Sequence, residues 1–209
     1  MQRSLSFPIY VLALIITIIM FAIGVYVGTL VDSINLNGLR ENLNDITADV
    51  SSMQLLLLSD EPELFCPVYA NQLSKVNSEI ETIGYKLTVL EEEKGIVDVD
   101  LKKQFFILEA NSYLLSKKTN GQCNKNTTLI LYFYSNKNCE SCQKQGLDLT
   151  EARRHSSNTL TYSFDGDLGS PIADAFKQKY DISVYPTIII NDQRFIGYTP
   201  TDKLRAALG

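Results

Sequence analysis

The stretch LILYFYSNKNCESC, residues 129–142, decides the fold of the C-terminal part of this chain. Its first six residues are apolar or aromatic without interruption, which is typical of a central β-strand that is buried on both faces. Four polar residues end the strand, and a pair of cysteines then opens a segment with the pattern of a helix up to Arg153 or Arg154. The stretch therefore predicts a strand, a short polar loop, and a helix that begins with Cys139 and Cys142.

The residues that follow continue to alternate between strands and helices. The patterns predict strands at 159–164, 187–190 and 194–196, and helices at 171–180 and 201–208. Asn191 and Asp192 form a tight turn between the last two strands, which makes them an antiparallel hairpin. This order predicts an α/β domain with a central mixed sheet flanked by helices.

Two cysteines three residues apart at the start of a helix have a specific chemical use. They lie on one face of the helix, and their sulfurs can reach disulfide distance. At the helix start, unpaired backbone N–H groups and the positive end of the helix dipole favour a thiolate, so we predict Cys139 as the nucleophile. Cys142 is then placed to resolve the mixed disulfide that Cys139 forms with a substrate protein. This exchange chemistry uses no cofactor, and we predict none.

A second segment strengthens this interpretation, since Asp181-Ile182-Ser183-Val184-Tyr185-Pro186-Thr187 leads directly into an apolar strand. With it the chain resembles the thioredoxin superfamily, whose members carry Cys-x-x-Cys after a buried strand and a cis-proline loop before the next strand. The resemblance covers roughly residues 129–208 and implies a thioredoxin-like thiol-disulfide oxidoreductase. It also implies that Pro186 is cis and packs beside the cysteine pair, and that Tyr185 contacts the substrate peptide.

The chain departs from the family pattern close to the cysteines. Asn138 stands where thioredoxins commonly carry Trp, and Phe133 stands at the place of their buried acid. Glu140 follows the nucleophile, where its charge disfavours the thiolate and opposes the helix dipole. The net redox direction is therefore left open, with oxidation or isomerisation slightly favoured over reduction.

The other two of the four cysteines, Cys66 and Cys123, leave alternatives open. An even count in an extracytoplasmic protein predicts a structural disulfide between them. A second redox pair that exchanges electrons with Cys139 and Cys142 is the alternative. Zinc held by all four thiolates is disfavoured, because structural zinc sites use closely spaced cysteine pairs, and we predict no metal site.

An unbroken apolar run of 23 residues, 9–31, lies near the N-terminus. About 20 such residues span the hydrocarbon core as a helix, whereas a cleavable signal peptide has a shorter apolar region. Arg3 precedes the run and Asp32 with further acidic residues follows it, which predicts residues 1–8 as a cytoplasmic tail. We therefore expect a single-pass anchor in the lipid bilayer of the cell membrane, with the C-terminal domain extracytoplasmic; cleavage after the run stays open.

Residues 32–122 show apolar residues at spacings of three and four, as in amphipathic or coiled-coil helices. Three helices are predicted, with apolar seams over 39–57 and 73–90 and a third helix over 100–118. Short connections favour antiparallel neighbours, so we expect a helical hairpin or three-helix bundle that holds the domain 123–209 off the membrane. The alternative to packing within the chain is a homodimer formed through the first or second helix.

The charge balance narrows the functional classes. With 19 basic and 24 acidic residues the net charge is −5, so no basic field attracts nucleic acid. We expect extracytoplasmic thiol-disulfide exchange on cysteine-containing exported proteins, with a membrane redox partner because one anchor helix carries no electrons itself. The alternative is a non-catalytic, membrane-anchored binding or scaffold protein that uses the helical stalk.

Overall fold

The computed structural model describes residues 7–58, 61–154, 156 and 158–208. The chain divides into two compact units, Met1–Asn42 and Leu43–Gly209. Most of the cytoplasmic tail predicted at 1–8, including Arg3, lies outside the described residues. Everything that bears on the candidate site lies in the second unit.

Helix α1 (Phe7–Leu58) runs without interruption through the stretches predicted as anchor and first stalk helix. The described apolar side chains between residues 10 and 26 are exposed, with Phe21 at 74%. Within the described part of the chain, no helix proves both long enough and apolar enough to cross a membrane. The run 9–31 includes positions whose side chains are not described, such as Ile9 and Val27. The anchor at 9–31 stays a prediction from the sequence.

Helices α2 (Pro62–Glu92) and α3 (Val99–Gln122) pack against each other as a hairpin. Asp98 caps α3, and its side chain accepts a hydrogen bond from the Leu101 N–H at 3.0 Å. Helix α2 begins earlier than its apolar seam suggests and contains Pro67. Pro67 lacks the N–H that would bond to the Glu63 carbonyl, and α2 nevertheless continues past it to Glu92.

The second half of the chain forms a four-stranded mixed sheet with strand order β2-β1-β3-β4. Strand β1 pairs in parallel with β2 and antiparallel with β3, and β3 pairs antiparallel with β4. The predicted mixed sheet flanked by helices is thereby confirmed. Its elements are β1 (Thr128–Tyr134), α4 (Glu140–Arg153), β2 (Thr159–Asp165), α5 (Pro171–Lys179), β3 (Thr187–Ile190), β4 (Gln193–Ile196) and α6 (Thr201–Leu208).

Helices cover both faces of this sheet. On one face, α4 and α6 pack over Ile130, Tyr132 and Ile188. On the other face, α3 and α5 pack over aromatic residues, where the rings of Phe133 and Phe164 stack with centroids 5.4 Å apart. Alternate residues of β1 point to opposite faces, and its central residues are all buried, as the apolar run predicted.

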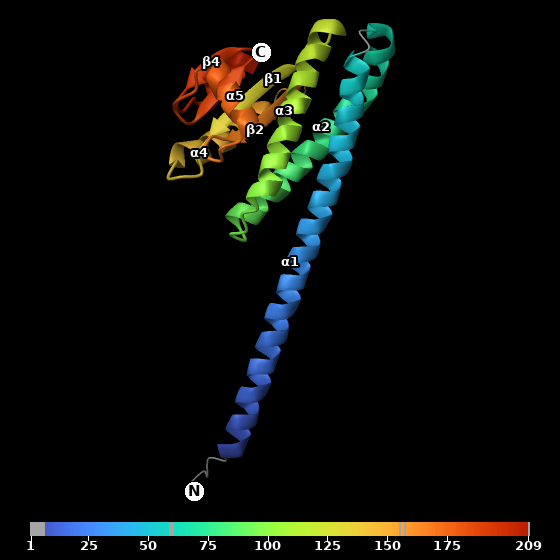
Figure 1. Ribbon diagram of the computed structural model, residues 1–209. Coiled ribbons are helices and arrows are strands. Elements are labelled where there is room, and N and C mark those ends of the chain that lie inside the picture. Colours follow the sequence, from blue (N-terminus) through green and yellow to red (C-terminus); the bar gives the residue numbers. More distant parts are fainter. Residues whose placement is uncertain (1–6, 59–60, 155, 157, 209) are drawn as a thin grey trace. The chain divides into compact units, whose positions relative to one another are not determined.

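Helix α3 differs from the stalk helix predicted for it. It lies beside β2 and β1 (Figure 1) and also contacts α2, so it belongs to the layered domain as much as to the helical hairpin. The physical reason is that α3 is apolar on more than one side. Phe106 packs on Phe164 of β2 with ring centroids 5.5 Å apart, and Phe105 lies against Gly84 of α2.

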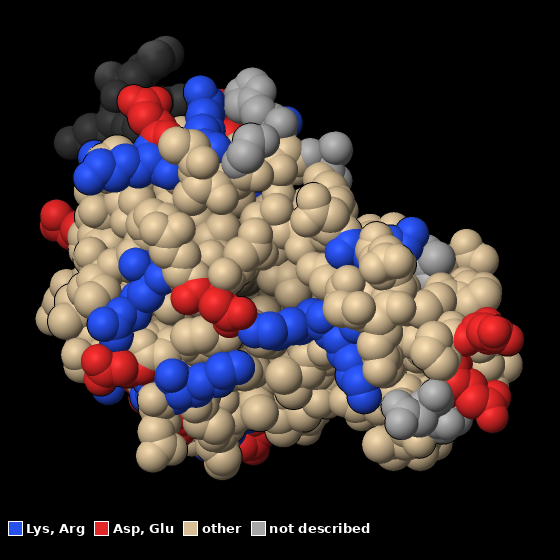
Figure 2. Space-filling model, turned by 90° about the horizontal axis from the view of Figure 1, so that it is seen from above, with Lys and Arg blue, Asp and Glu red and all other residues tan. Residues whose placement is uncertain are grey.

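The surface carries charges of both signs. Figure 2 shows Lys and Arg side chains lying beside Asp and Glu side chains on one face of the molecule. Several exposed charges form ion pairs, including Arg154 with Glu151 at 2.9 Å. Exposed pairs of this kind contribute at most about 1 kcal/mol each, so the stability of the fold depends on the core described above.

One acidic side chain, Glu109 of α3, is buried at 4% exposure against the outer edge of the sheet. Its Oε1 accepts a hydrogen bond from the Ser163 N–H at 3.1 Å, which satisfies a donor on the outer edge of β2. Its Oε2 has no hydrogen-bond partner. Burial raises the pKa of Glu109 well above its usual value, so the carboxyl stays protonated in the folded protein at a pH where the unfolded chain is already ionised.

This burial predicts how stability changes with pH. The contribution of Glu109 to the free energy of unfolding is fully present below the ordinary pKa of Glu in the unfolded chain, and it is lost as the pH rises through the raised pKa of the folded protein. Glu109→Gln keeps the acceptor for Ser163 and removes the titration. Its free energy of unfolding in urea, measured from pH 4 to 8, should exceed that of the wild type increasingly as the pH rises. Parallel profiles of the wild type and Glu109→Gln would contradict this assignment.

Candidate functional site

The cysteine pair lies where β1 gives way to α4. Asn138 has a positive φ of 52°, a conformation that Asn tolerates better than most residues. This residue turns the chain so that Cys139 becomes the N-cap of α4, and the Cys142 N–H donates to its Sγ at 3.2 Å. Cys139 and Cys142 form a disulfide with Cα atoms 5.2 Å apart.

The two sulfurs have different surroundings. Cys142 is buried at 3% exposure, while Cys139 is half-buried and lines an open hollow of about 820 Å³. The Ser135 N–H points at the Cys142 Sγ from 3.4 Å, and the Tyr132 hydroxyl donates to the Cys142 carbonyl at 2.6 Å. An incoming sulfur can therefore reach Cys139, whereas Cys142 is held behind it.

The loop before β3 lies at the same hollow. The Tyr185–Pro186 peptide bond is cis, and the Pro186 carbonyl accepts a hydrogen bond from the Gly197 N–H at 2.8 Å. Pro186 is buried, while Tyr185 lines the hollow together with Cys139. The structure thus brings Tyr185 to the same hollow as Cys139, and Pro186 is buried directly after it in the chain.

Gly166, directly after β2, determines where the Tyr185 ring lies. A Cβ atom at Gly166 would overlap the ring and hydroxyl of Tyr185. Lys177 of α5 donates to the Gly166 carbonyl at 3.0 Å, which fixes the backbone there. Sequence reasoning missed this glycine. Its place immediately after a predicted strand was the available signal, because a glycine there often permits a close approach of another segment.

A buried charged group under the loop was also missed. Lys102 of α3 is 3% exposed, and its Nζ lies 2.8 Å from Glu91 Oε2 and 3.1 Å from Asp165 Oδ2. Asn136, from the loop before Cys139, donates to the same Asp165 oxygen at 3.0 Å. Burial and the nearby carboxylates raise the pKa of Tyr134 well above its usual range. In the sequence, only the position of Lys102 next to Leu101, a residue of the apolar seam, pointed to its burial.

The other two cysteines are paired elsewhere. Cys66 and Cys123 form a disulfide with Cα atoms 5.6 Å apart, and both are half-buried. Cys66 lies inside α2, in the first turns after its start at Pro62. Cys123 directly follows α3. With both pairs disulfide-bonded, none of the four cysteines is a free thiol.

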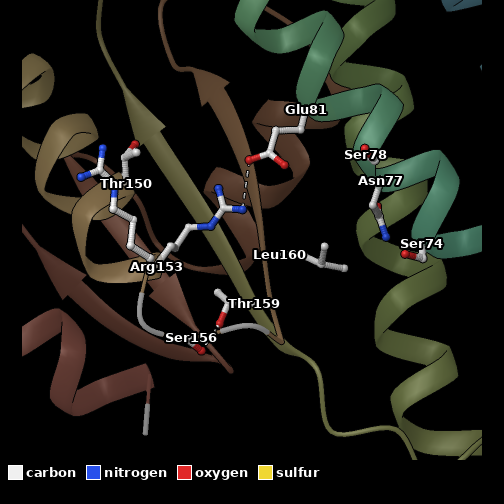
Figure 3. A pocket seen from close by; sticks show the side chains of 10 residues that line it. Ser74, Asn77, Ser78, Glu81, Thr150, Arg153, Ser156, Thr159 and Leu160 are labelled. Atoms are coloured by element: carbon white, nitrogen blue, oxygen red, sulfur yellow. Dashed lines mark hydrogen bonds and ion pairs between the residues drawn. The ribbon is translucent and has the colours of Figure 1, made fainter.

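A second hollow, of about 410 Å³, is lined by residues of α2, by the end of α4 and by the start of β2 (Figure 3). Arg153 reaches across it to Glu81, with the Nη2 and Oε1 atoms 3.2 Å apart. Its lining contains none of the four cysteines, and the Arg153 guanidinium is already paired with Glu81. We assign no chemistry to it.

The chain matches no protein-family model and no curated protein. Thioredoxin-2, described as a component of malaria parasite protein secretion machinery, is 24% identical with a TM-score of 0.34, over 39% of this chain and 81% of that one. Chloroplastic thioredoxin z is 20% identical with a TM-score of 0.36, over 45% and 86%. The germline-specific thioredoxin Deadhead of Drosophila melanogaster is 17% identical with a TM-score of 0.31, over 44% and 87%. These likenesses concern the fold alone. The mixed sheet flanked by helices fits a thioredoxin-like domain.

Proposed function

We propose that this protein carries out thiol-disulfide exchange on cysteines of exported proteins through the Cys139 and Cys142 couple. The observation that carries the proposal is the unequal placement of the two sulfurs. Cys139 caps α4 at an open hollow, and Cys142 is buried directly behind it at 3% exposure. This arrangement suits one sulfur for contact with a substrate and the other for release of that substrate.

In the oxidising direction, a substrate thiolate attacks the Sγ of Cys139, the bond to Cys142 breaks, and Cys142 leaves as a thiolate. A second thiolate of the substrate then attacks the substrate sulfur of the mixed disulfide, and Cys139 leaves as a thiolate. The two protons released by the substrate thiols return to the two cysteines through solvent. Two electrons and two protons have then moved from the substrate dithiol to the couple, and reduction runs through the same steps in reverse.

The start of α4 stabilises the thiolate form of Cys139. The Cys142 N–H at 3.2 Å from the Cys139 Sγ stabilises negative charge on that sulfur, and the helix dipole adds to it. Glu140 in the first turn of α4 acts against both by repelling the charge. We propose that the couple works as an oxidase or isomerase, in keeping with a compartment in which disulfides persist.

The location is part of the proposal and rests on the sequence. A second disulfide, Cys66–Cys123, supports an oxidising compartment outside the cytosol, and a membrane protein that restores the couple would then be required. The anchor at 9–31 stays a prediction. Fractionation of the full chain tests it: retention in the membrane pellet after alkaline extraction supports an anchor, and release into the supernatant contradicts it.

The proposed activity is tested by equilibrating the full chain with glutathione buffers and measuring how much of the Cys139 and Cys142 pair is oxidised. We expect one two-electron transition, together with turnover of a reduced or scrambled disulfide protein. A potential near −120 mV indicates an oxidant, and one near −270 mV a reductant. A pair that does not cycle, in a chain that still captures protein partners, would favour the alternative of a non-catalytic scaffold.

The contact between Gly166 and Tyr185 predicts a selective effect on substrate binding. Gly166→Ala displaces the Tyr185 ring from its place at the hollow, and Tyr185→Ala removes it. We expect both variants to raise KM for a protein substrate by about three- to tenfold, or roughly 1 kcal/mol, and to leave the reaction with a small disulfide unchanged. An unchanged KM in both variants would show that Tyr185 does not contact the substrate.

A further inference from the structure

The α2–α3 hairpin is closed at both ends, and the two closures differ. At one end, the Cys66–Cys123 disulfide joins the start of α2 to the end of α3. At the other end, Glu91 near the end of α2 pairs with Lys102 near the start of α3, with 2.8 Å between the charged atoms. The Glu91–Lys102 pair also lies next to the loop before Cys139, where Asn136 is 3.5 Å from Glu91 Oε2.

Contacts connect Lys102 to the dithiol in a continuous series. Lys102 holds Asp165 Oδ2 at 3.1 Å, and Asp165 Oδ1 accepts the Asp167 N–H at 2.9 Å. Asp167 Oδ2 accepts the Ser135 hydroxyl at 2.6 Å, and the Ser135 N–H points at the Cys142 Sγ from 3.4 Å.

A shorter link runs through Asn136. Its side chain donates to Asp165 Oδ2 at 3.0 Å and lies 3.5 Å from Glu91 Oε2, and the residue lines the hollow at Cys139. Two neighbouring residues of the loop before the nucleophile are thus connected to Lys102 of the helical hairpin, Ser135 through Asp167 and Asp165, and Asn136 through Asp165.

We propose that the Glu91–Lys102 pair sets the reduction potential of the Cys139 and Cys142 couple by its charge, with Lys102 acting through Asp165 and the loop before Cys139. This inference rests on the proposed function. The thioredoxin-like part of the chain contributes Asp165 and Asn136, and the hairpin contributes the buried cation Lys102 and its second carboxylate, Glu91. The α2–α3 hairpin therefore contributes residues to the surroundings of the redox couple and does more than hold the domain.

Electrostatics gives the two charged residues opposite effects. Reduction converts a neutral disulfide into sulfurs of which one carries negative charge, so a nearby cation stabilises the reduced form and a nearby carboxylate destabilises it. Lys102→Met should shift the equilibrium with glutathione toward the disulfide, by about three- to tenfold. Glu91→Gln should shift it toward the dithiol by a similar factor. A tenfold change corresponds to about 30 mV for this two-electron couple.

The experiment measures the reduction potential of the full chain and its variants in glutathione buffers. Lys117→Met is the matched control, since Lys117 is on the same helix and pairs with Asp192 at 2.7 Å on the exposed surface. Its potential should equal that of the wild type. Opposite shifts in Lys102→Met and Glu91→Gln support the proposal, and Glu91→Gln alone decides the matter if Lys102→Met does not fold.

Two results would overturn the proposal while leaving the exchange activity intact. In the first, folded Lys102→Met and Glu91→Gln both keep the reduction potential of the wild type. In the second, both variants shift the potential in the same direction, as a loosened loop alone would. A wild-type chain whose Cys139 and Cys142 pair does not equilibrate with glutathione at all would instead reject the proposed function, and this inference with it.

Discussion

Replacing Cys139 by serine should lower turnover of a protein disulfide on the order of a thousandfold or more, because the variant lacks the only accessible sulfur of the couple. Cys142 remains, but at 3% exposure it is not within reach of a substrate. Turnover is measured with insulin or with reduced ribonuclease, under conditions in which the wild-type chain cycles.

The control for this variant is Ser141→Ala. The Ser141 hydroxyl lies 3.5 Å from the Cys139 Sγ, so the change alters the same surroundings without removing the nucleophile. We expect turnover within about threefold of the wild type, or less than 1 kcal/mol of transition-state free energy. The stability of Cys139→Ser is compared with that of the reduced wild type, since both lack the short disulfide. Normal turnover in a folded Cys139→Ser variant would reject the proposed mechanism.

Removing the second disulfide should lower the stability of the fold and leave turnover nearly unchanged. The Cys66–Cys123 bond spans 57 residues, and a loop of this length stabilises the folded state by roughly 4 kcal/mol through the entropy of the unfolded chain. The double variant Cys66→Ala, Cys123→Ala should therefore unfold at much lower urea concentration. Its turnover at low temperature, where it stays folded, should remain within about twofold of the wild type.

This double variant separates a structural bond from a second redox pair. Stability is measured by urea unfolding with Cys139 and Cys142 kept oxidised, so that only one disulfide differs. Lost turnover with unchanged stability would show that Cys66 and Cys123 pass electrons to the couple. Lost stability with retained turnover is the result that the structural assignment requires.

The sheet and the position of the cysteine pair could be predicted because local patterns determine them. The apolar run of β1 has no polar face, so it belongs in the centre of a sheet. The spacing of Cys139 and Cys142 at a helix start, followed later by the Tyr185-Pro186 step, indicates the thioredoxin pattern without any long-range information.

The role of α3 could not be predicted in this way. Its apolar residues have the spacing of a bundle helix, and nothing local shows that Phe106 contacts β2 while Phe105 contacts α2. The contact of Lys102 with Asp165 joins residues 63 apart in the sequence, so only the tertiary fold reveals it. For the same reason the helical segment was interpreted as a stalk, although one of its helices forms a layer of the domain.

The central claim is that Cys139 bonds covalently to a substrate and that, in the reducing direction, Cys142 attacks the Cys139 Sγ and releases it. The most direct measurement uses Cys142→Ser, which can form the mixed disulfide with an oxidised substrate but cannot release it in this way. Reduced Cys142→Ser chain is mixed with an oxidised disulfide protein, quenched with acid and analysed by intact mass and peptide mapping. The account predicts a mixed disulfide at Cys139 that dithiothreitol removes and that Cys139→Ser does not form. A substrate adduct at another cysteine, or none while the Cys139 thiol is free, would contradict it.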